Sequence, residues 1–285
     1  MTAIYPDFYG SFACKAAACR HSCCRGWEID VDEESAAYYR ALPGPLGDAL
    51  RAALVETEDG CHFRLTDEER CPFLRPDGLC RLIRELGEEA LCDICALHPR
   101  FYAEVGEYEL CGLGLSCEMV CQLLFSTSAP LRFATENGES LDFAALLRRL
   151  GLEAGETPQR FVPAPSVARY KEILRCLSDT EPIDAAWPEQ IHALAACLPD
   201  LVENAADYAV VCDSGRYDRI YQYILFRQLE RAGEYPIGAL ADFARRSTEF
   251  IFMQDALLGA DPEHLRRWSE QIEYSTEAID RLLNG

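Results

Sequence analysis

Four cysteines stand within eleven residues near the start of the chain, and they constrain its fold more than any other feature: Cys14, Cys19, Cys23 and Cys24. A neutral thiol fills apolar space little better than alanine or valine does. Once deprotonated, however, thiols are soft anionic ligands for metals. The segment is polar and loop-like, so core packing does not explain it. The sequence therefore predicts a metal or cluster site at this loop.

The other cysteines are distributed unevenly along the chain. Twelve of the fifteen lie between Cys14 and Cys121. The first ten residues lack the basic and apolar regions of a secretory signal, which makes a cytoplasmic location the expectation. Disulfide frameworks belong mainly to small secreted domains, whereas a reducing cytosol keeps thiols free. We therefore expect metal ligation or redox chemistry.

The formal charge of −21 excludes some classes of partner. A protein that follows phosphates needs a concentrated Lys/Arg surface, so nucleic acid is not an expected ligand. The same charge disfavours an anionic membrane surface, and no apolar run approaches the length of a spanning helix. An acidic surface would instead attract a basic or lysine-bearing partner.

The residue patterns predict a mainly α protein. We expect an irregular cysteine-rich metal-binding module with a few short strands over 1–127, a helix and linker over 128–165, and an all-helical domain over 166–285. The linker itself is placed at 154–165, and strand character is found at 26–32 and 107–113. Helices are expected at 33–41, 45–56, 79–86, 141–150, 166–178, 188–198, 200–211, 216–232, 237–258 and 262–283.

Two kinds of metal site remain open from the residues alone. Zinc sites usually pair short C-x2-C spacings, and in the first module only Cys92 and Cys95 have that spacing. Iron–sulfur clusters tolerate more irregular loops. Cys71 is followed by proline, as is the last ligand in many cluster-binding runs. Six other cysteines are interpreted as buried thiols that bind no metal. They are Cys61, Cys111, Cys121, Cys176, Cys197 and Cys212.

The cysteine motifs, taken in order, resemble the flagellin lysine-N-methylase family. The motifs are Cys14-x4-Cys19-x3-Cys23-Cys24, Cys71-Pro-Phe-Leu, Gly-Leu-Cys80, Cys95-x3-Pro-Arg and Leu-Ser-Cys117. More broadly, the pattern is similar to zinc- or iron-chelating proteins named for a C-x2-C-x2-C-C motif. The first spacings here are x4 and x3, as in the flagellin-methylase branch. The resemblance covers roughly residues 5–125.

The resemblance implies an activity and a ligand set. It implies S-adenosylmethionine-dependent N-methylation of lysines on a protein, with flagellin as the substrate, and a 4Fe-4S cluster, with zinc as the alternative metal. The alternative to an enzyme is a non-enzymatic iron–sulfur or zinc-binding protein with a redox or interaction role. Eight cysteines match those of the family: Cys14, Cys19, Cys23, Cys24, Cys71, Cys80, Cys95 and Cys117.

The sequence does not identify the methyl-donor site, the catalytic residues or the oligomeric state. No glycine-rich turn of the dinucleotide-binding type and no C-x3-C-x2-C motif is found in a convincing context. Residues of a suitable type to deprotonate or orient an amine are more simply explained as core or surface residues. They are Tyr102, Glu107, Tyr108, Tyr217, Asp218 and Tyr221. The stripe of apolar residues that includes Tyr217 and Tyr221 is expected to belong to the core.

Overall fold

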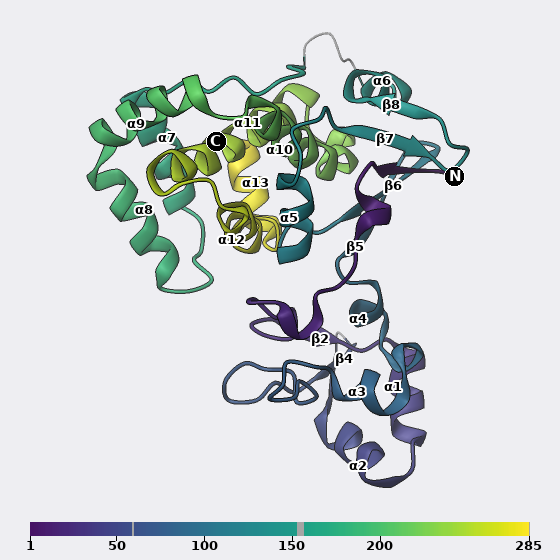
Figure 1. Ribbon diagram of the computed structural model, residues 1–285. Helices are drawn as coiled ribbons and strands as arrows, with labels where there is room; N and C mark the ends of the chain where they lie inside the picture. Colours follow the sequence, from purple (N-terminus) through teal and green to yellow (C-terminus); the bar gives the residue numbers. More distant parts are fainter. Residues whose placement is uncertain (59, 153–156, 285) are drawn as a thin grey trace. The chain divides into compact units, whose positions relative to one another are not determined.

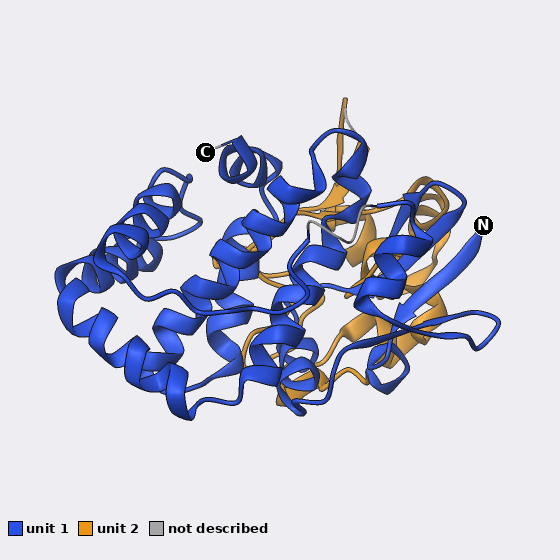
Figure 2. Ribbon diagram, turned by 90° about the horizontal axis from the view of Figure 1, so that it is seen from above, with its two compact units in different colours: residues 1–12, 102–285 blue, residues 13–101 orange. Residues whose placement is uncertain are grey.

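The computed structural model describes residues 1–58, 60–152 and 157–284 (Figure 1). The chain forms two compact units (Figure 2). The helical unit joins Met1–Phe12 to Tyr102–Gly285, and the cysteine unit consists of Ala13–Phe101. The predicted mainly α class is confirmed. Among the described helices, none combines the length and apolar character needed to cross a membrane.

A five-stranded sheet in the helical unit explains why the first residues belong there. Its order is β5-β6-β1-β7-β8, with β1 parallel to β6 and antiparallel to β7. In register, Ile4 of β1 lies opposite Leu110 of β6 and Thr135 of β7. This pairing places residues 1–12 and 102–127 in the helical unit, whereas the predicted module boundaries are 1–127, 128–165 and 166–285. The strands are β1 (Thr2–Pro6), β5 (Arg100–Val105), β6 (Tyr108–Leu113), β7 (Arg132–Thr135) and β8 (Ser140–Asp142).

Helices make up most of the helical unit. The helix expected over 237–258 is confirmed as α11, which is buried on nearly all sides and packs on α10 and α9 (Figure 1). The helix expected over 262–283 is instead two helices, α12 and α13, because the first ends at Ile272. The helices are α5 (Glu118–Phe125), α6 (Phe143–Arg149), α7 (Val167–Ser178), α8 (Ala186–Ala196), α9 (Leu198–Val211), α10 (Ser214–Arg227), α11 (Ile237–Leu258), α12 (Pro262–Ile272) and α13 (Thr276–Asn284).

Polar contacts of buried side chains tie the sheet to these helices. The hydroxyl of Tyr223 in α10 accepts a hydrogen bond from the N–H of Leu113 at 2.6 Å and donates one to the carbonyl oxygen of Leu113 at 2.7 Å. Arg219, which is 1% exposed, pairs through both terminal nitrogens with Asp7, just after β1. The apolar stripe of α10, with Tyr217 and Tyr221, is buried as expected.

The predicted linker packs on the helical unit where the structure describes it. Residues 154–156 of the segment 154–165 lie outside the described residues. Phe161 is buried, and its N–H donates to Asp218 at 2.8 Å. The N–H of Ala164 donates to the buried Glu249 at 2.9 Å. Residues 157–165 are therefore held in place by side chains of α10 and α11.

The cysteine unit is built on a small antiparallel sheet in the order β2-β4-β3. One prediction here is wrong, because the helix expected over 45–56 ends at Ala53. Residues from Leu54 onward pair with β4 instead, so that Val55 lies opposite His62. The elements are β2 (Ile29–Asp30), α1 (Glu33–Ala41), α2 (Gly44–Ala53), β3 (Leu54–Thr57), β4 (Gly60–Phe63), α3 (Arg81–Leu86) and α4 (Asp93–Leu97).

Candidate metal centre

The first cysteines lie on the loop that precedes β2. A single 3-10 turn, Ala16–Ala18, follows Cys14, whose sulfur accepts a hydrogen bond from the N–H of Ala16 at 3.3 Å. The indole of Trp27 donates to the carbonyl oxygen of Cys23 at 2.7 Å. Cys14 and Cys23 are exposed, whereas Cys24 is half-buried. The loop therefore turns inward at its last cysteine.

Backbone pairing joins Cys24 to the second cysteine-bearing segment. The N–H of Cys71 donates to the carbonyl oxygen of Cys24 at 2.9 Å. Immediately beside it, Arg25 and Arg70 form an isolated antiparallel bridge. Two segments that are 47 residues apart thus bring their cysteines to adjacent positions.

Cys71 and Cys80 lie on the two arms of a tight hairpin. Leu74 pairs with Cys80, and the chain turns at Asp77-Gly78, where Gly78 has a positive φ of 78°. The sulfur of Cys71 accepts hydrogen bonds from the backbone N–H groups of Phe73 and Leu74. That of Cys80 accepts from those of Leu82 and Ile83. Such N–H donors stabilise the thiolate form, which is the form that binds a metal.

The last two thiols of the group lie at the start of α4. Cys92 is 1% exposed, its sulfur accepts from the N–H of Cys95, and the two thiols are hydrogen-bonded to each other. Asp32 fixes this helix in place because one of its oxygens accepts from the N–H of Asp93 at 2.9 Å. Its other oxygen accepts from Ser35 at 2.8 Å and so caps α1.

These elements bring five thiols within electrostatic range of one another. They are Cys24, Cys71, Cys80, Cys92 and Cys95. The group borders the core of the unit, where Tyr39, Phe63 and Phe73 stack. In the part of the chain that the structure describes, no three Cys, His, Asp or Glu side chains converge closely enough to hold a metal ion.

The pKa values of the five thiols are displaced in both directions. Burial raises the pKa of Cys71 to about 12 and also raises that of Cys80. A hydrogen bond from Cys23 lowers the pKa of Cys24 to about 7. The mutual hydrogen bond lowers the pKa of Cys92 and raises that of Cys95, so this pair retains one proton firmly. Two of the five thiols are thus already disposed to be thiolates.

The donor chemistry fits a thiolate-ligated metal or cluster. Four separate segments supply the five sulfurs, three of which accept backbone N–H donors, and the site contains no competing lysine. Hydrogen bonds to the sulfurs and a largely apolar surrounding are properties that tune iron–sulfur sites. Ligation would require the sulfurs to move closer together than they are here.

The predicted ligand set is only partly gathered. Cys24, Cys71, Cys80 and Cys95 belong to the group of five. Cys14, Cys19 and Cys23 stay on the loop, and Cys117 belongs to the helical unit, where it directly precedes α5. The prediction omitted Cys92, although the C-x2-C spacing of Cys92 and Cys95 was the signal that would have identified it.

The residues considered as proton acceptors have other partners or are exposed. Tyr217 donates to Asp255 at 2.6 Å, Tyr221 donates to the carbonyl oxygen of Pro158 at 2.9 Å, and Asp218 accepts from Phe161. Tyr102 is 47% exposed, and Glu107 and Tyr108 lie at or beside the start of β6. None of them is assigned a catalytic role.

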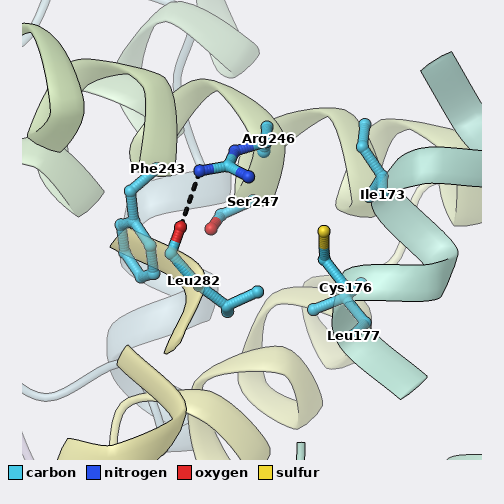
Figure 3. Close-up of a pocket in the computed structure, with 7 residues that line it drawn as sticks. All are labelled: Ile173, Cys176, Leu177, Phe243, Arg246, Ser247 and Leu282. Atoms are coloured by element: carbon cyan, nitrogen blue, oxygen red, sulfur yellow. Dashed lines mark hydrogen bonds between the residues drawn. The ribbon is translucent and has the colours of Figure 1, made fainter. Parts of the chain in front are cut away.

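A small apolar cavity in the helical unit does not provide a cofactor site. It is lined by side chains of α7, α11 and α13, among them Ile173, Cys176, Phe243 and Leu282 (Figure 3). Its volume is about 10 Å³, which is at the lower limit for a single water molecule. A molecule the size of S-adenosylmethionine does not fit there.

Comparison with known proteins finds sequence relatives of this chain. A lysine-N-methylase of Salmonella choleraesuis (strain SC-B67) is 30% identical, over the whole of this chain and 68% of that protein. A lysine-N-methylase of Salmonella typhimurium (strain LT2) is 28% identical over the same shares. The flagellar biosynthetic protein FliU of Salmonella muenchen is 27% identical over 52% of this chain and 90% of its own. No family model and no solved structure matches the chain.

Proposed function

The chain belongs to the lysine-N-methylase family, and on this premise we propose that it is a protein lysine methyltransferase that uses S-adenosylmethionine and carries a cysteine-ligated 4Fe-4S cluster. The observation that carries the proposal is the 30% identity over the entire chain to a protein named lysine-N-methylase. The proposed substrate is a protein with exposed lysines, and flagellin is the specific candidate.

The basic residues of the chain support a lysine-directed activity. Of its 27 basic residues 25 are arginines, and the only lysines are Lys15 and Lys171. A guanidinium group remains protonated at neutral pH and does not offer the nucleophilic nitrogen that a lysine amine offers. An enzyme with this composition presents few targets for its own reaction. Its 48 acidic residues would also attract a basic substrate.

The proposed cluster would be held by thiols of the cysteine unit. Cys24, Cys71, Cys80 and Cys95 are common to the family motifs and to the gathered group, and Cys92 lies among them. When bound, such a cluster supplies either a structural cross-link between the segments or a redox-sensitive centre. Zinc remains the alternative metal because tetrahedral thiolate ligation suits it equally.

The reaction also requires that the amine of the substrate lysine be neutral. A free lysine has a pKa of about 10.4, so fewer than about one in a thousand is neutral at pH 7. In the transfer, the amine nitrogen forms a bond to the methyl carbon as the bond from that carbon to the donor sulfur breaks. A proton acceptor close to the amine would raise the neutral fraction and so the rate.

The test combines metal analysis with methyl transfer. The full chain is purified anaerobically, and its iron, sulfide and zinc contents are measured. It is then incubated with S-adenosylmethionine and flagellin, and methyl-lysine is detected by mass spectrometry. The K15R/K171R variant contains no lysine, so in that variant all methyl-lysine comes from the substrate. Flagellin whose lysines have been chemically acetylated, and which therefore offers no nucleophilic amine, serves as the matched control.

We expect iron and sulfide in the protein and methyl-lysine on untreated flagellin only. A metal-loaded chain that neither binds S-adenosylmethionine in calorimetry nor methylates flagellin would favour the non-enzymatic alternative. A colourless protein with stoichiometric zinc would replace the cluster by a zinc site and leave the methyltransferase proposal to be decided by the activity.

A further inference from the structure

A polar cavity lies beside the cysteine loop within the cysteine unit. Its volume is about 120 Å³, roughly ten times the minimum that one buried water needs. Four arginines line it: Arg20, Arg25, Arg70 and Arg75. The rest of its wall includes the small residues Ala16 and Ala17 and the half-buried Ser22. The cavity is cationic in a chain whose net charge is −21.

Two of these arginines face each other without a compensating acid. Arg25 and Arg70 form an antiparallel bridge, so their Cα atoms are directly paired across two strands. Like charges in such a pair repel each other and destabilise the pairing. Among the residues that the structure describes, neither guanidinium has an ion-pair partner. Arg75 differs, since Asp77 accepts from it at 2.9 Å.

We propose that this cavity binds a phosphate-like oxyanion between Arg25 and Arg70. A guanidinium group donates two parallel hydrogen bonds to a pair of phosphate oxygens, and such charge-assisted bonds are stronger than neutral ones. A bound oxyanion offsets the repulsion across the bridge and satisfies donors that the protein leaves unpaired. The site does not depend on the proposed methyltransferase activity.

The chemistry of the cavity selects against the methyl donor. S-adenosylmethionine carries a cationic sulfonium and an ammonium group beside its single carboxylate, and the guanidinium groups of Arg25 and Arg70 would repel the two cations. A group with two or more negative oxygens matches the cavity better. The oxyanion can be a free inorganic ion or the phosphoryl group of a nucleotide, and the chemistry is the same for both.

The test measures phosphate binding by the full, metal-loaded chain. Sodium phosphate is titrated in calorimetry and in thermal melting, with sodium chloride at equal ionic strength as the reference. The test variant is R25Q/R70Q. The matched control is R64Q/R84Q, which removes two exposed arginines of the same unit that do not line the cavity. Metal content is measured for every variant, and AMP is titrated alongside phosphate.

We expect phosphate to raise the melting temperature of the wild type and of the control pair. In R25Q/R70Q the affinity should fall at least tenfold, and without phosphate at low ionic strength this variant should melt no lower than the wild type. Tighter binding of AMP than of phosphate would identify a nucleotide as the source of the oxyanion, and equal or weaker binding would identify the free ion.

Three results would overturn the proposal. The first is a wild type that responds to phosphate no more than to sodium chloride. The second is an equal loss of affinity in the R64Q/R84Q control, which would indicate general charge attraction. The third is an unchanged phosphate affinity in the single variant R25Q, which replaces R25Q/R70Q if the double variant loses its metal or does not fold.

Discussion

Replacing Asp32 by alanine tests how the cysteine unit holds α4, and with it Cys92 and Cys95. Asp32 is the only described side chain that bonds to the backbone at the start of both α1 and α4, accepting from Ser35 and from Asp93. Loss of the carboxylate leaves two backbone N–H groups without their partners. We therefore expect D32A to destabilise the unit and to lower its metal content.

The magnitude follows from the two hydrogen bonds. Removing an aspartate N-cap costs about 1 kcal/mol. A hydrogen bond to a charged group contributes about 1.5–3 kcal/mol when buried. Asp32 is only half-buried, so the second bond is discounted toward the lower end of that range. The sum for D32A is about 2.5 kcal/mol. Asparagine caps a helix nearly as well as aspartate, so D32N should cost only about 1 kcal/mol.

The assay is urea unfolding of the metal-loaded chain, followed by metal analysis of the folded fraction. The control is D142A, which removes the N-cap of α6 in the helical unit, where Asp142 accepts from Ala145 at 2.7 Å. We expect D142A to lose about 1 kcal/mol and to keep its metal. Equal metal content in D32A and the wild type would refute the link between this cap and the thiols. A D32N as unstable as D32A would refute the separation into two bonds.

The pH dependence of the same residue has a definite sign. Burial raises the pKa of Asp32. The hydrogen bonds from the N–H groups of Asp93 and Ser35 together lower this pKa by more than burial raises it, so the pKa lies below its ordinary value. Its contribution is therefore complete above the ordinary aspartate pKa of about 3.9 and is lost as the pH falls through the folded-state pKa. The stability difference between wild type and D32N should be constant from pH 5 to 7 and should shrink in acid. Urea midpoints at each pH measure it, and a difference that grows in acid would contradict the assignment.

Three further predictions concern single positions. C92S should lose as much metal as a family-motif cysteine does, whereas C117S should retain it, as measured by metal analysis; the reverse order would refute the gathered group. D7N should destabilise the helical unit by about 3–5 kcal/mol in thermal or urea unfolding, because it leaves the buried Arg219 unpaired. Y217F should lower the free energy of unfolding by about 1–3 kcal/mol, since the buried Asp255 loses a hydrogen-bond donor at 2.6 Å. For D7N and for Y217F alike, an unfolding midpoint equal to that of the wild type would contradict the prediction.

Local patterns were enough to predict most helices, because their apolar faces repeat at the helical period. Helix α11 was predicted to the residue, and the core role of Tyr217 follows from the same periodicity. Long-range pairing was not accessible from such patterns. Nothing in the sequence of residues 2–6 indicates that β1 joins Tyr108–Leu113 in parallel across a hundred residues. The division into units depends on that pairing.

The candidate site shows the same contrast. The family resemblance implied that Cys71, Cys80 and Cys95 belong to one ligand set, and the structure brings them into one group. The predicted set omitted Cys92, although its C-x2-C spacing with Cys95 was a signal for it. The arginine cavity was also missed, because the repulsion between Arg25 and Arg70 arises only when two distant segments are paired.

The pKa values of the five thiols indicate an order of deprotonation. Ionising Cys71, with a pKa of about 12, at pH 7 costs on the order of 7 kcal/mol. Cys24, with a pKa of about 7, and Cys92, whose pKa is also lowered, therefore lose their protons before Cys71 and would bind a metal as thiolates at the lowest cost. Brief alkylation of the metal-free chain at pH 7.5 should label Cys24 well before Cys71 in mass spectrometry. Equal labelling in the folded protein would refute this order.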